Sequence, residues 1–209
     1  IQLLFLKLGL LIILILLVDQ CLKIYIKTHF YYGQEVTLLG SWFRLHFIEN
    51  EGMAFGMKFG DASIAKLVLT LFRLVAVGFG FYYLNVMIKK GFKNATLICA
   101  ALILAGAFGN LIDSIFYGKL FSESGFCLAQ WVPWGKGYAN LFYGRVVDML
   151  YFPLIEWTLP SSTPFIGAYT IRFFEPVFNI ADASISIGVL TLLFFQKRLL
   201  TLPKEVKTD

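Results

Sequence analysis

The stretch VFNIADASISIGVLTLLFFQKRL, residues 177–199, decides how this chain folds. It is long and apolar enough to cross a bilayer, which takes about 20 residues. Asp182 nevertheless lies within it, although an ionised carboxylate in hydrocarbon costs roughly 2.5 kcal/mol or more. An acid at this depth indicates a functional site with a partner nearby, and we expect that partner among Asp19, Asp113 and Asp148.

The composition of the whole chain indicates the same setting. Of the 209 residues, 58% are hydrophobic and 15% are charged, whereas about 25% of a soluble domain is charged. We predict an all-α membrane protein that folds as one domain over 1–209, a bundle of four transmembrane helices with a small outer β-cradle and interfacial aromatic segments. The four predicted spans are 3–26, 64–88, 95–117 and 177–199.

Basic residues predict the orientation in the membrane. Seven of the 18 lysines and arginines lie between the second and third spans or at the end of the fourth and in the tail after it, and the positive-inside rule makes those segments cytoplasmic. Both termini are then cytoplasmic, and segments 27–63 and 118–176 face outward. Because these clusters explain most of the net charge of +5, we predict no nucleic-acid binding. The chain starts at Ile1 rather than Met, so we expect its natural N-terminus to be missing. The seven residues are Lys89, Lys90, Lys93, Lys197, Arg198, Lys204 and Lys207.

The two outer segments carry patterns that soluble loops lack. Residues 36–48 alternate between polar and apolar side chains, which predicts a half-buried strand. Residues 120–175 are rich in aromatic side chains, glycine and proline. This composition favours a sheet or short helices at the level of the lipid headgroups.

The four acids are predicted to meet near the outer leaflet. With a rise of about 1.5 Å per residue, Asp182, Asp113 and Asp19 lie about 6–12 Å from the outer ends of their helices, and Asp148 lies in the outer segment. Two facing carboxylates in a dry site share one proton. The ionised member then activates water while the protonated one polarises a carbonyl. On the residues alone, a hydrolase and a proton-coupled transporter are equally supported.

Simpler roles are also available to several of these residues. Asp19 and Lys23 are spaced i, i+4 and form a structural pair as readily as a functional one. Arg73 is a candidate counter-ion for one acid. Glycines 106 and 109 indicate close packing between helices.

Two asparagines precede acids by three residues and therefore share a helix face with them. Asn110 stands before Asp113, and Asn179 before Asp182. An amide can orient or hydrogen-bond a carboxylate, so we expect each asparagine to hold the acid that follows it. The three cysteines are odd in number and lack ligand spacing, so we predict neither a disulfide framework nor a metal site.

Five blocks of sequence, in order, resemble the prolipoprotein signal peptidases, or signal peptidase II. They are DQCLK (19–23), FIENEGMAFG (47–56), GAFGNLID (106–113), VVD (146–148) and FNIAD (178–182). The resemblance covers nearly the whole chain, and five matching blocks in order make chance an unsatisfactory explanation.

The resemblance implies a bacterial inner-membrane aspartic endopeptidase. Such an enzyme removes the signal peptide from a diacylglyceryl-modified prolipoprotein, just before the lipidated cysteine. Asp148 and Asp182 match the catalytic pair. The family needs no metal or organic cofactor, works among membrane lipids and is inhibited by globomycin, and we expect a monomer. Residues that bind substrate or shape the site match Asp19, Lys23, Asn50, Gly52, Asn110, Asp113, Asn179 and Ala181.

Some features depart from the family pattern. Ser114 stands where the family usually has an arginine, so we expect Arg73 or Arg145 to substitute for it. Extra outer sequence surrounds Asp148, at about 119–145 and 153–173. Two alternatives stay open beside the peptidase: a proton-coupled membrane transporter and a catalytically inactive relative.

Overall fold

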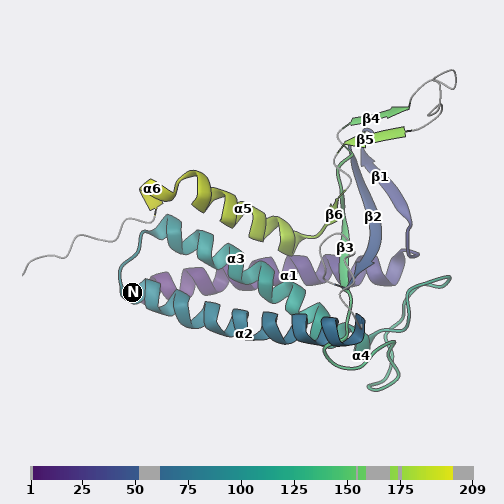
Figure 1. The fold of residues 1–209 in the computed structure, drawn as a ribbon, viewed down its shortest axis with the longest axis horizontal. Helices are drawn as coiled ribbons and strands as arrows, with labels where there is room; N and C mark the ends of the chain where they lie inside the picture. Colours follow the sequence, from purple (N-terminus) through teal and green to yellow (C-terminus); the bar gives the residue numbers. More distant parts are fainter. Residues whose placement is uncertain (1, 52–61, 154, 159–169, 174–175, 200–209) are drawn as a thin grey trace, which may run out of the picture.

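The computed structural model describes residues 2–51, 62–153, 155–158, 170–173 and 176–199. Its helices form a bundle with a small antiparallel sheet across one end (Figure 1). Helix α3 packs against α1, α2 and α5 and is therefore the central helix. The helices are α1 (Gln2–His29), α2 (Ala62–Lys89), α3 (Asn94–Ile112), α4 (Gly118–Leu120), α5 (Ile180–Phe194) and α6 (Gln196–Leu199).

Three described helices are long and apolar enough to cross a membrane, namely α1, α2 and α3 with its continuation to Leu120. The predicted fourth span, 177–199, is shorter in the structure, because α5 has 15 residues. Its start is delayed by Asn179, which has an extended backbone and accepts a hydrogen bond from the Asp182 amide at 2.8 Å. Asparagine is a favoured residue at this capping position.

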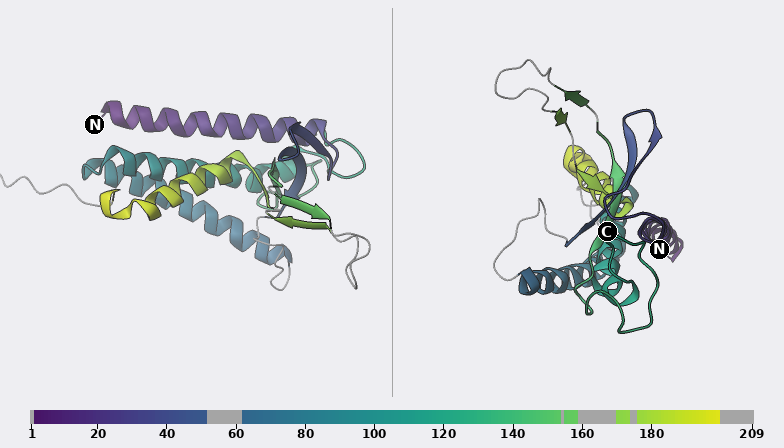
Figure 2. Two further views of the ribbon diagram at one scale, coloured as in Figure 1. Left: turned by 90° about the horizontal axis from the view of Figure 1, so that it is seen from above. Right: turned by 90° about the vertical axis from the view of Figure 1, so that its right-hand side faces the viewer.

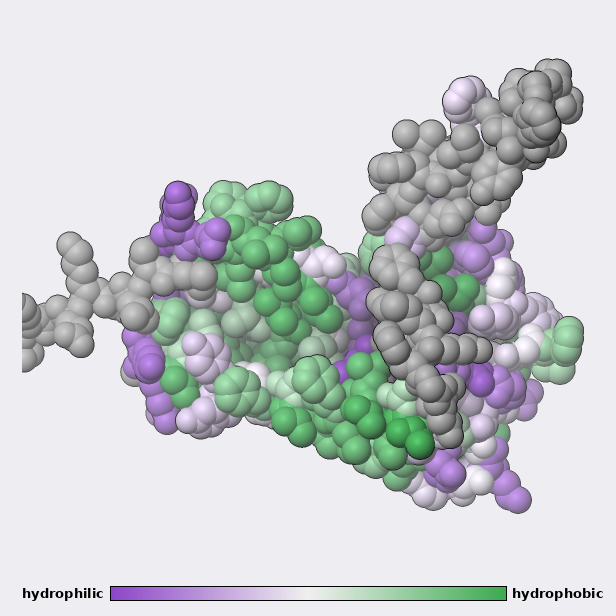
Figure 3. All heavy atoms as spheres, in the orientation of Figure 1, coloured by the Kyte–Doolittle hydropathy of each residue, from purple (hydrophilic) through white to green (hydrophobic). Residues whose placement is uncertain are grey.

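The outer faces of the bundle are apolar. In α1 and in α2, only 17% of the most apolar stretch of the helix is buried inside the protein, whereas in α3 the buried share is 56%. Large side chains such as Phe79 and Val75 point outward with 63% and 71% exposure. On the face seen in Figure 3, hydrophobic residues cover the helices and polar residues gather toward both ends. Such a surface suits lipid, and the chain is a multi-pass membrane protein.

The main sheet has the strand order β1-β2-β3-β6, with antiparallel neighbours. Its strands are β1 (Glu35–Leu39), β2 (Phe43–Asn50), β3 (Val146–Tyr151) and β6 (Val177–Phe178). A separate pair, β4 (Ile155–Thr158) with β5 (Thr170–Phe173), projects beyond it (Figure 2). The prediction of one strand over 36–48 is wrong. A turn with Gly40 in the left-handed region, φ +52°, splits it into a hairpin.

A π-helical turn, η2 (Asp113–Tyr117), continues α3 and determines where β3 lies. Carbonyl groups along it bind the backbone of the loop that precedes β3, as in the hydrogen bond from Gly144 N to Ser114 O at 2.9 Å. The contact is so close that a Cβ on Gly144 would lie 2.1 Å from the Asp113 carbonyl oxygen. This docking brings the strand that carries Asp148 against the third helix.

The basic clusters gather at the end of the bundle opposite the sheet (Figure 1). The start of α1, the connection from α2 to α3 and the end of α5 all lie there. Lys93 bonds to the carbonyl of Arg198 across this end. Lys204 and Lys207, the other basic residues of the predicted tail, lie outside the described residues.

Candidate active site

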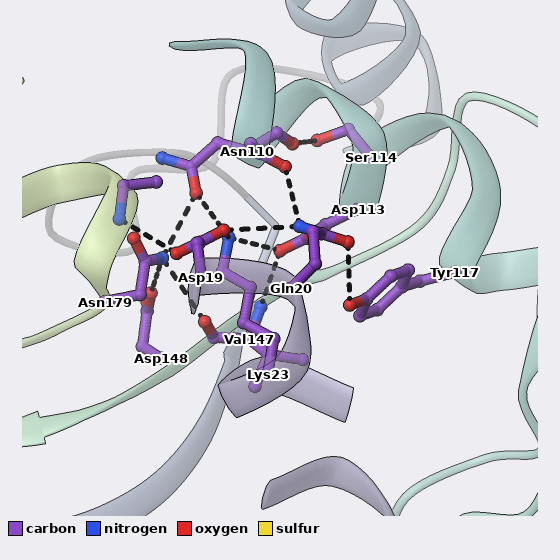
Figure 4. A network of polar contacts seen from close by, with 12 residues as sticks. Asp19, Gln20, Lys23, Asn110, Asp113, Ser114, Tyr117, Val147, Asp148 and Asn179 are labelled. Atoms are coloured by element: carbon purple, nitrogen blue, oxygen red, sulfur yellow. Dashed lines mark hydrogen bonds and ion pairs between the residues drawn. The ribbon is translucent and has the colours of Figure 1, made fainter. Parts of the chain in front are cut away.

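Lys23 is the centre of a buried polar network (Figure 4). Its Nζ lies 2.9 Å from Asp19 Oδ2 and 2.7 Å from Asp113 Oδ2, and it donates to Asn110 Oδ1 at 2.9 Å. The lysine and both acids are at most 1% exposed. The i, i+4 pair expected from the sequence is confirmed, and Asp113 is a second partner.

Gln20 extends this network and was not among the predicted site residues. Its amide donates to Asp113 Oδ1 at 2.8 Å, and its oxygen accepts from the Tyr117 hydroxyl at 3.1 Å. The sequence did contain a signal for its role, because Gln20 is a polar residue next to Asp19 within a predicted transmembrane span. Ala181, which the sequence did single out, takes part through its backbone, whose N–H donates to Asp19 Oδ1 at 2.8 Å.

Two asparagine amides hold the candidate catalytic acids. Asn179 Nδ2 donates to Asp148 Oδ1 at 2.7 Å, and Asn110 Nδ2 donates to Asp182 Oδ1 at 2.7 Å. The two amides are themselves joined, from Asn179 Nδ2 to Asn110 Oδ1 at 3.1 Å. Asn50, at the end of β2, also hydrogen-bonds with Asp148. Acids from β3 and α5 are thus held by one connected set of neutral groups.

The expected pairing with the acid three residues later is wrong for Asn110, and for Asn179 it holds through the backbone N–H of Asp182 rather than through the carboxyl group. Asn110 bonds Asp182 on the neighbouring helix instead of Asp113. Asp113 begins the π-helical turn and receives Lys23 and Gln20 instead. Asn179 uses its oxygen to cap α5, so its amide group is turned toward β3.

Asp148 lies in an environment that favours its protonated form. It is 2% exposed, whereas Asp182 is only partly buried. Two effects raise the pKa of Asp148 to about 7: its burial, which is the larger, and the negative charge of Asp182. Two interacting carboxyl groups of this kind titrate as a pair and hold one proton near neutral pH.

Ser114 is fully buried one helical turn after Asn110. Its Oγ donates to Asn110 O at 2.9 Å and accepts from Arg73 Nη1 at 3.5 Å. Of the two arginines expected to substitute for the family arginine, Arg73 is therefore the one near Ser114. Arg145 pairs with Glu49, at 3.1 Å, and with Glu123.

A second buried network joins α1, β2 and the loop before β3, and the sequence analysis missed it. Lys27 and Glu49 form an ion pair with side chains 0% and 1% exposed. Ser124 accepts from Lys27 at 2.8 Å and donates to Glu49 at 2.9 Å. The Tyr138 ring lies between two cations, 5.0 Å from Lys27 Nζ and 5.0 Å from Arg145 Cζ. Spacing alone gave no signal for contacts between such distant segments.

One predicted site residue, Gly52, lies outside the described residues. Within the part of the chain that is described, no group of three His, Cys, Asp or Glu side chains is placed to hold a metal ion. The expectation that no metal or organic cofactor is needed stays a prediction.

Comparison with known proteins places these contacts in a family context. A family model described as "Signal peptidase (SPase) II" matches residues 11–197. A lipoprotein signal peptidase of Porphyromonas gingivalis is 50% identical over 193 residues, 92% of this chain and 83% of the relative. One from Amoebophilus asiaticus is 37% identical over 189 residues, 89% of this chain and 75% of the relative.

Solved structures share the fold. One bacterial membrane enzyme superposes with a TM-score of 0.55 at 21% identity, covering 96% of this chain and 94% of its own. A second gives a TM-score of 0.56 at 20% identity, covering 92% and 93%.

Proposed function

Because this chain belongs to the signal peptidase II family, we propose that Asp148 and Asp182 are the catalytic pair with which it cleaves its substrate. The chain is a membrane protease that removes signal peptides from prolipoproteins. The cut falls just before the diacylglyceryl-modified cysteine, and the aspartate pair cleaves the peptide bond directly. Asp19, Lys23, Asn50, Gly52, Asn110, Asp113, Asn179 and Ala181 bind the substrate or shape the site.

The observation that carries this proposal is the joined pair of amides. Asn179 and Asn110 hold one carboxyl group each, with donor distances of 2.7 Å, and bond to each other. The two amides bond to the Oδ1 oxygens, and Asn50 also bonds to Asp148. The protonated member of the pair can donate to a peptide carbonyl, and the ionised member can accept from water. An amide restricts the position of a carboxyl group but carries no charge, so the pair keeps the freedom to exchange a proton.

The reaction follows from one proton shared by two acids. The ionised carboxylate takes a proton from water as the water oxygen attacks the scissile carbonyl carbon. The protonated partner donates to the carbonyl oxygen, which gives a neutral tetrahedral intermediate. When the C–N bond breaks, the leaving nitrogen receives a proton from the pair. The burial of Asp148, whose pKa is raised to about 7, supports a protonated member at neutral pH.

An apolar groove along the helices suits the helix of a signal peptide. It lies between α2, α3 and α5, has a volume of about 410 Å³ and is lined by Val77, Gly80, Leu104 and Leu192 among others. At Gly80 the helix α2 approaches α3 closely, because a Cβ there would lie 2.8 Å from Leu104 Cδ1. The groove extends from Phe92 and Thr96, near the α2–α3 connection, to Ala107, three residues before Asn110, so a signal peptide lying along it points toward the acids.

An aromatic row on the sheet suits the lipid part of the substrate. Phe43 and Phe152 stack with ring centroids 4.7 Å apart, and Phe152 stacks on Phe178 at 5.7 Å. Phe178 directly precedes Asn179, so the row extends from the acids to the half-exposed Trp42. Membrane lipids and the diacylglyceryl chains are the ligands proposed for this row.

The finer topology belongs to the same proposal. The chain is one domain, with α5 as a fourth, shorter span, in the bacterial inner membrane. Both termini are cytoplasmic, the site lies at the outer leaflet, and the enzyme acts as a monomer. The gathering of basic residues at the end opposite the sheet supports this orientation.

A cleavage assay on purified enzyme in detergent tests the proposal. Wild-type enzyme should shorten a diacylglyceryl-modified precursor on a gel and leave the unmodified precursor intact. Asp148→Asn and Asp182→Asn should abolish cleavage, and Glu35→Gln, at the exposed edge of the sheet, should not. Globomycin should inhibit. Wild-type turnover in either aspartate variant would overturn the assignment, and no turnover by folded wild-type protein would support an inactive relative.

A further inference from the structure

Helix α2 turns a polar face toward the site. Lys66, Thr70 and Arg73 follow at spacings of four and three residues, which places them on one side of the helix. Lys66 is 4% exposed and Thr70 is fully buried, in a helix whose other buried side chains, such as Val77 and Leu84, are apolar. Each of the three side chains donates a hydrogen bond to a group outside α2.

The partners of this face are part of the catalytic end of the molecule. Thr70 Oγ1 donates to the Phe142 carbonyl oxygen at 3.0 Å, in the loop that leads to β3. Arg73 Nη1 donates to Ser114 Oγ at 3.5 Å, and Ser114 in turn donates to the carbonyl oxygen of Asn110, whose amide holds Asp182.

Positive charge near the catalytic pair comes from few groups. Lys23 is in contact with Asp19 and Asp113, which occupy two of its three donor hydrogens. The bonds described to Asp148 and Asp182 come from neutral amides. The guanidinium of Arg73 interacts electrostatically with three acids. The interaction with Asp182 is the strongest, followed by those with Asp113 and Asp148.

We propose that Arg73 is a positioning residue for this reaction, supplying from α2 the positive charge that keeps one member of the Asp148–Asp182 pair ionised. This inference rests on the proposed function, and it concerns what controls the protonation of the Asp148–Asp182 pair. Arg73 acts through space and through Ser114. Arg145 is committed to Glu49 and Glu123, so it does not fill this role.

The sign of the effect follows from electrostatics. A nearby cation favours the ionised carboxylate, so removing it makes the pair hold its protons to higher pH. The other charged groups that surround the pair, Asp19, Lys23, Lys66 and Asp113, stay in place. Neutralising Arg73 should therefore move the pH–rate profile toward alkaline pH by about one unit.

The test compares kcat/KM over pH for Arg73→Gln, Arg73→Lys and Arg44→Gln. Arg44→Gln is the matched control. It also removes one positive charge, but from β2, where Arg44 pairs with Glu35 of the edge strand β1. Only Arg73→Gln should shift the profile. An unchanged midpoint in Arg73→Gln, whatever its rate, overturns the proposal, as does an equal shift in Arg73→Lys.

A second readout does not depend on turnover. Infrared difference spectroscopy follows the titration of the carboxyl pair, with Asp148→Asn assigning its band. Arg73→Gln should titrate at higher pH than wild type, and identical titrations overturn the role of Arg73 even if the enzyme cleaves nothing. Absent cleavage by wild type would overturn the proposed function instead.

If Arg73→Gln does not fold, one cysteine variant supplies the same contrast. Arg73→Cys is made in protein whose exposed Cys21 and Cys127 are serine. Reaction with an aminoethyl thiosulfonate restores a positive charge, and reaction with a methyl thiosulfonate leaves the position neutral. A profile shifted in the methyl form relative to the aminoethyl form supports the proposal, and equal profiles overturn it.

Discussion

Substituting Gly106 by alanine should disable the enzyme by separating two helices. The new Cβ would lie 2.1 Å from the Ala181 carbonyl oxygen and 2.7 Å from Ile185 Cγ1. Carbon and oxygen normally approach to about 3.3 Å, so α5 must move by about 1 Å from α3. The Asn110–Asp182 hydrogen bond, now 2.7 Å, would then exceed hydrogen-bonding distance.

The expected magnitudes follow from that displacement. Overpacking costs about 1–3 kcal/mol of stability, and a shift of about 1 Å at reacting groups costs about 100-fold in rate. Cleavage of the lipidated precursor and thermal unfolding in detergent measure the two effects. The matched control is Gly78→Ala in α2, where a Cβ meets no heavy atom within 4 Å. Wild-type activity and stability in Gly106→Ala would refute the argument from packing.

Three further predictions concern the polar groups. Glu49→Gln should lower stability by about 3–5 kcal/mol, since it leaves Lys27 buried without its ion-pair partner, and Lys27→Met with Glu49→Gln should recover much of the loss in a thermal melt. Asn179→Ser should keep the helix cap and lose most of the cleavage activity, while Asn179→Ala should also lose about 1 kcal/mol of stability; equal activity in wild type and Asn179→Ser would contradict the role of the amide. Since burial and the charge of Asp182 raise the pKa of Asp148 to about 7, the pair loses its shared proton, and cleavage should decline, as the pH rises through that value. The same shift means that the folded protein binds more protons than the unfolded chain above about pH 4, so the contribution of Asp148 to stability is lost as the pH rises toward 7. Asp182→Asn should lower the pH at which Asp148 titrates in infrared spectra, and an unchanged midpoint would contradict coupling between the two acids.

Much of this arrangement could be predicted because the membrane makes a few signals strong. Long apolar runs and the cost of a charge in lipid indicated the spans and drew attention to Asp19, Asp113 and Asp182. The structure brings these acids into one connected network with Asp148. The fourth span was overestimated because apolarity does not reveal where a cap begins a helix.

The hydrogen-bond partners could not be predicted, since they depend on how helices pack. Spacing placed Asn110 beside Asp113, but the π-helical turn and the close contact between α3 and α5 direct Asn110 to Asp182. The ion pair of Lys27 with Glu49 joins segments 22 residues apart through a sheet whose register no local pattern specified. Local patterns report burial, whereas partners depend on the tertiary fold.

The two kinds of acid in this site have different kinds of partner, and the chemistry gives the reason. Asp19 and Asp113 share Lys23 by direct contact, which ties the three side chains into one buried ion-pair network. Asp148 and Asp182 are held by amides, because a cation in direct contact lowers the pKa of a carboxyl group by about 1–3 units and would leave the pair without a proton to donate. A cation linked to the pair through Ser114 and Asn110, as Arg73 is, biases it more weakly. The Lys23 ion pairs can therefore fix the frame of the site while neutral amides hold the acids that must exchange a proton.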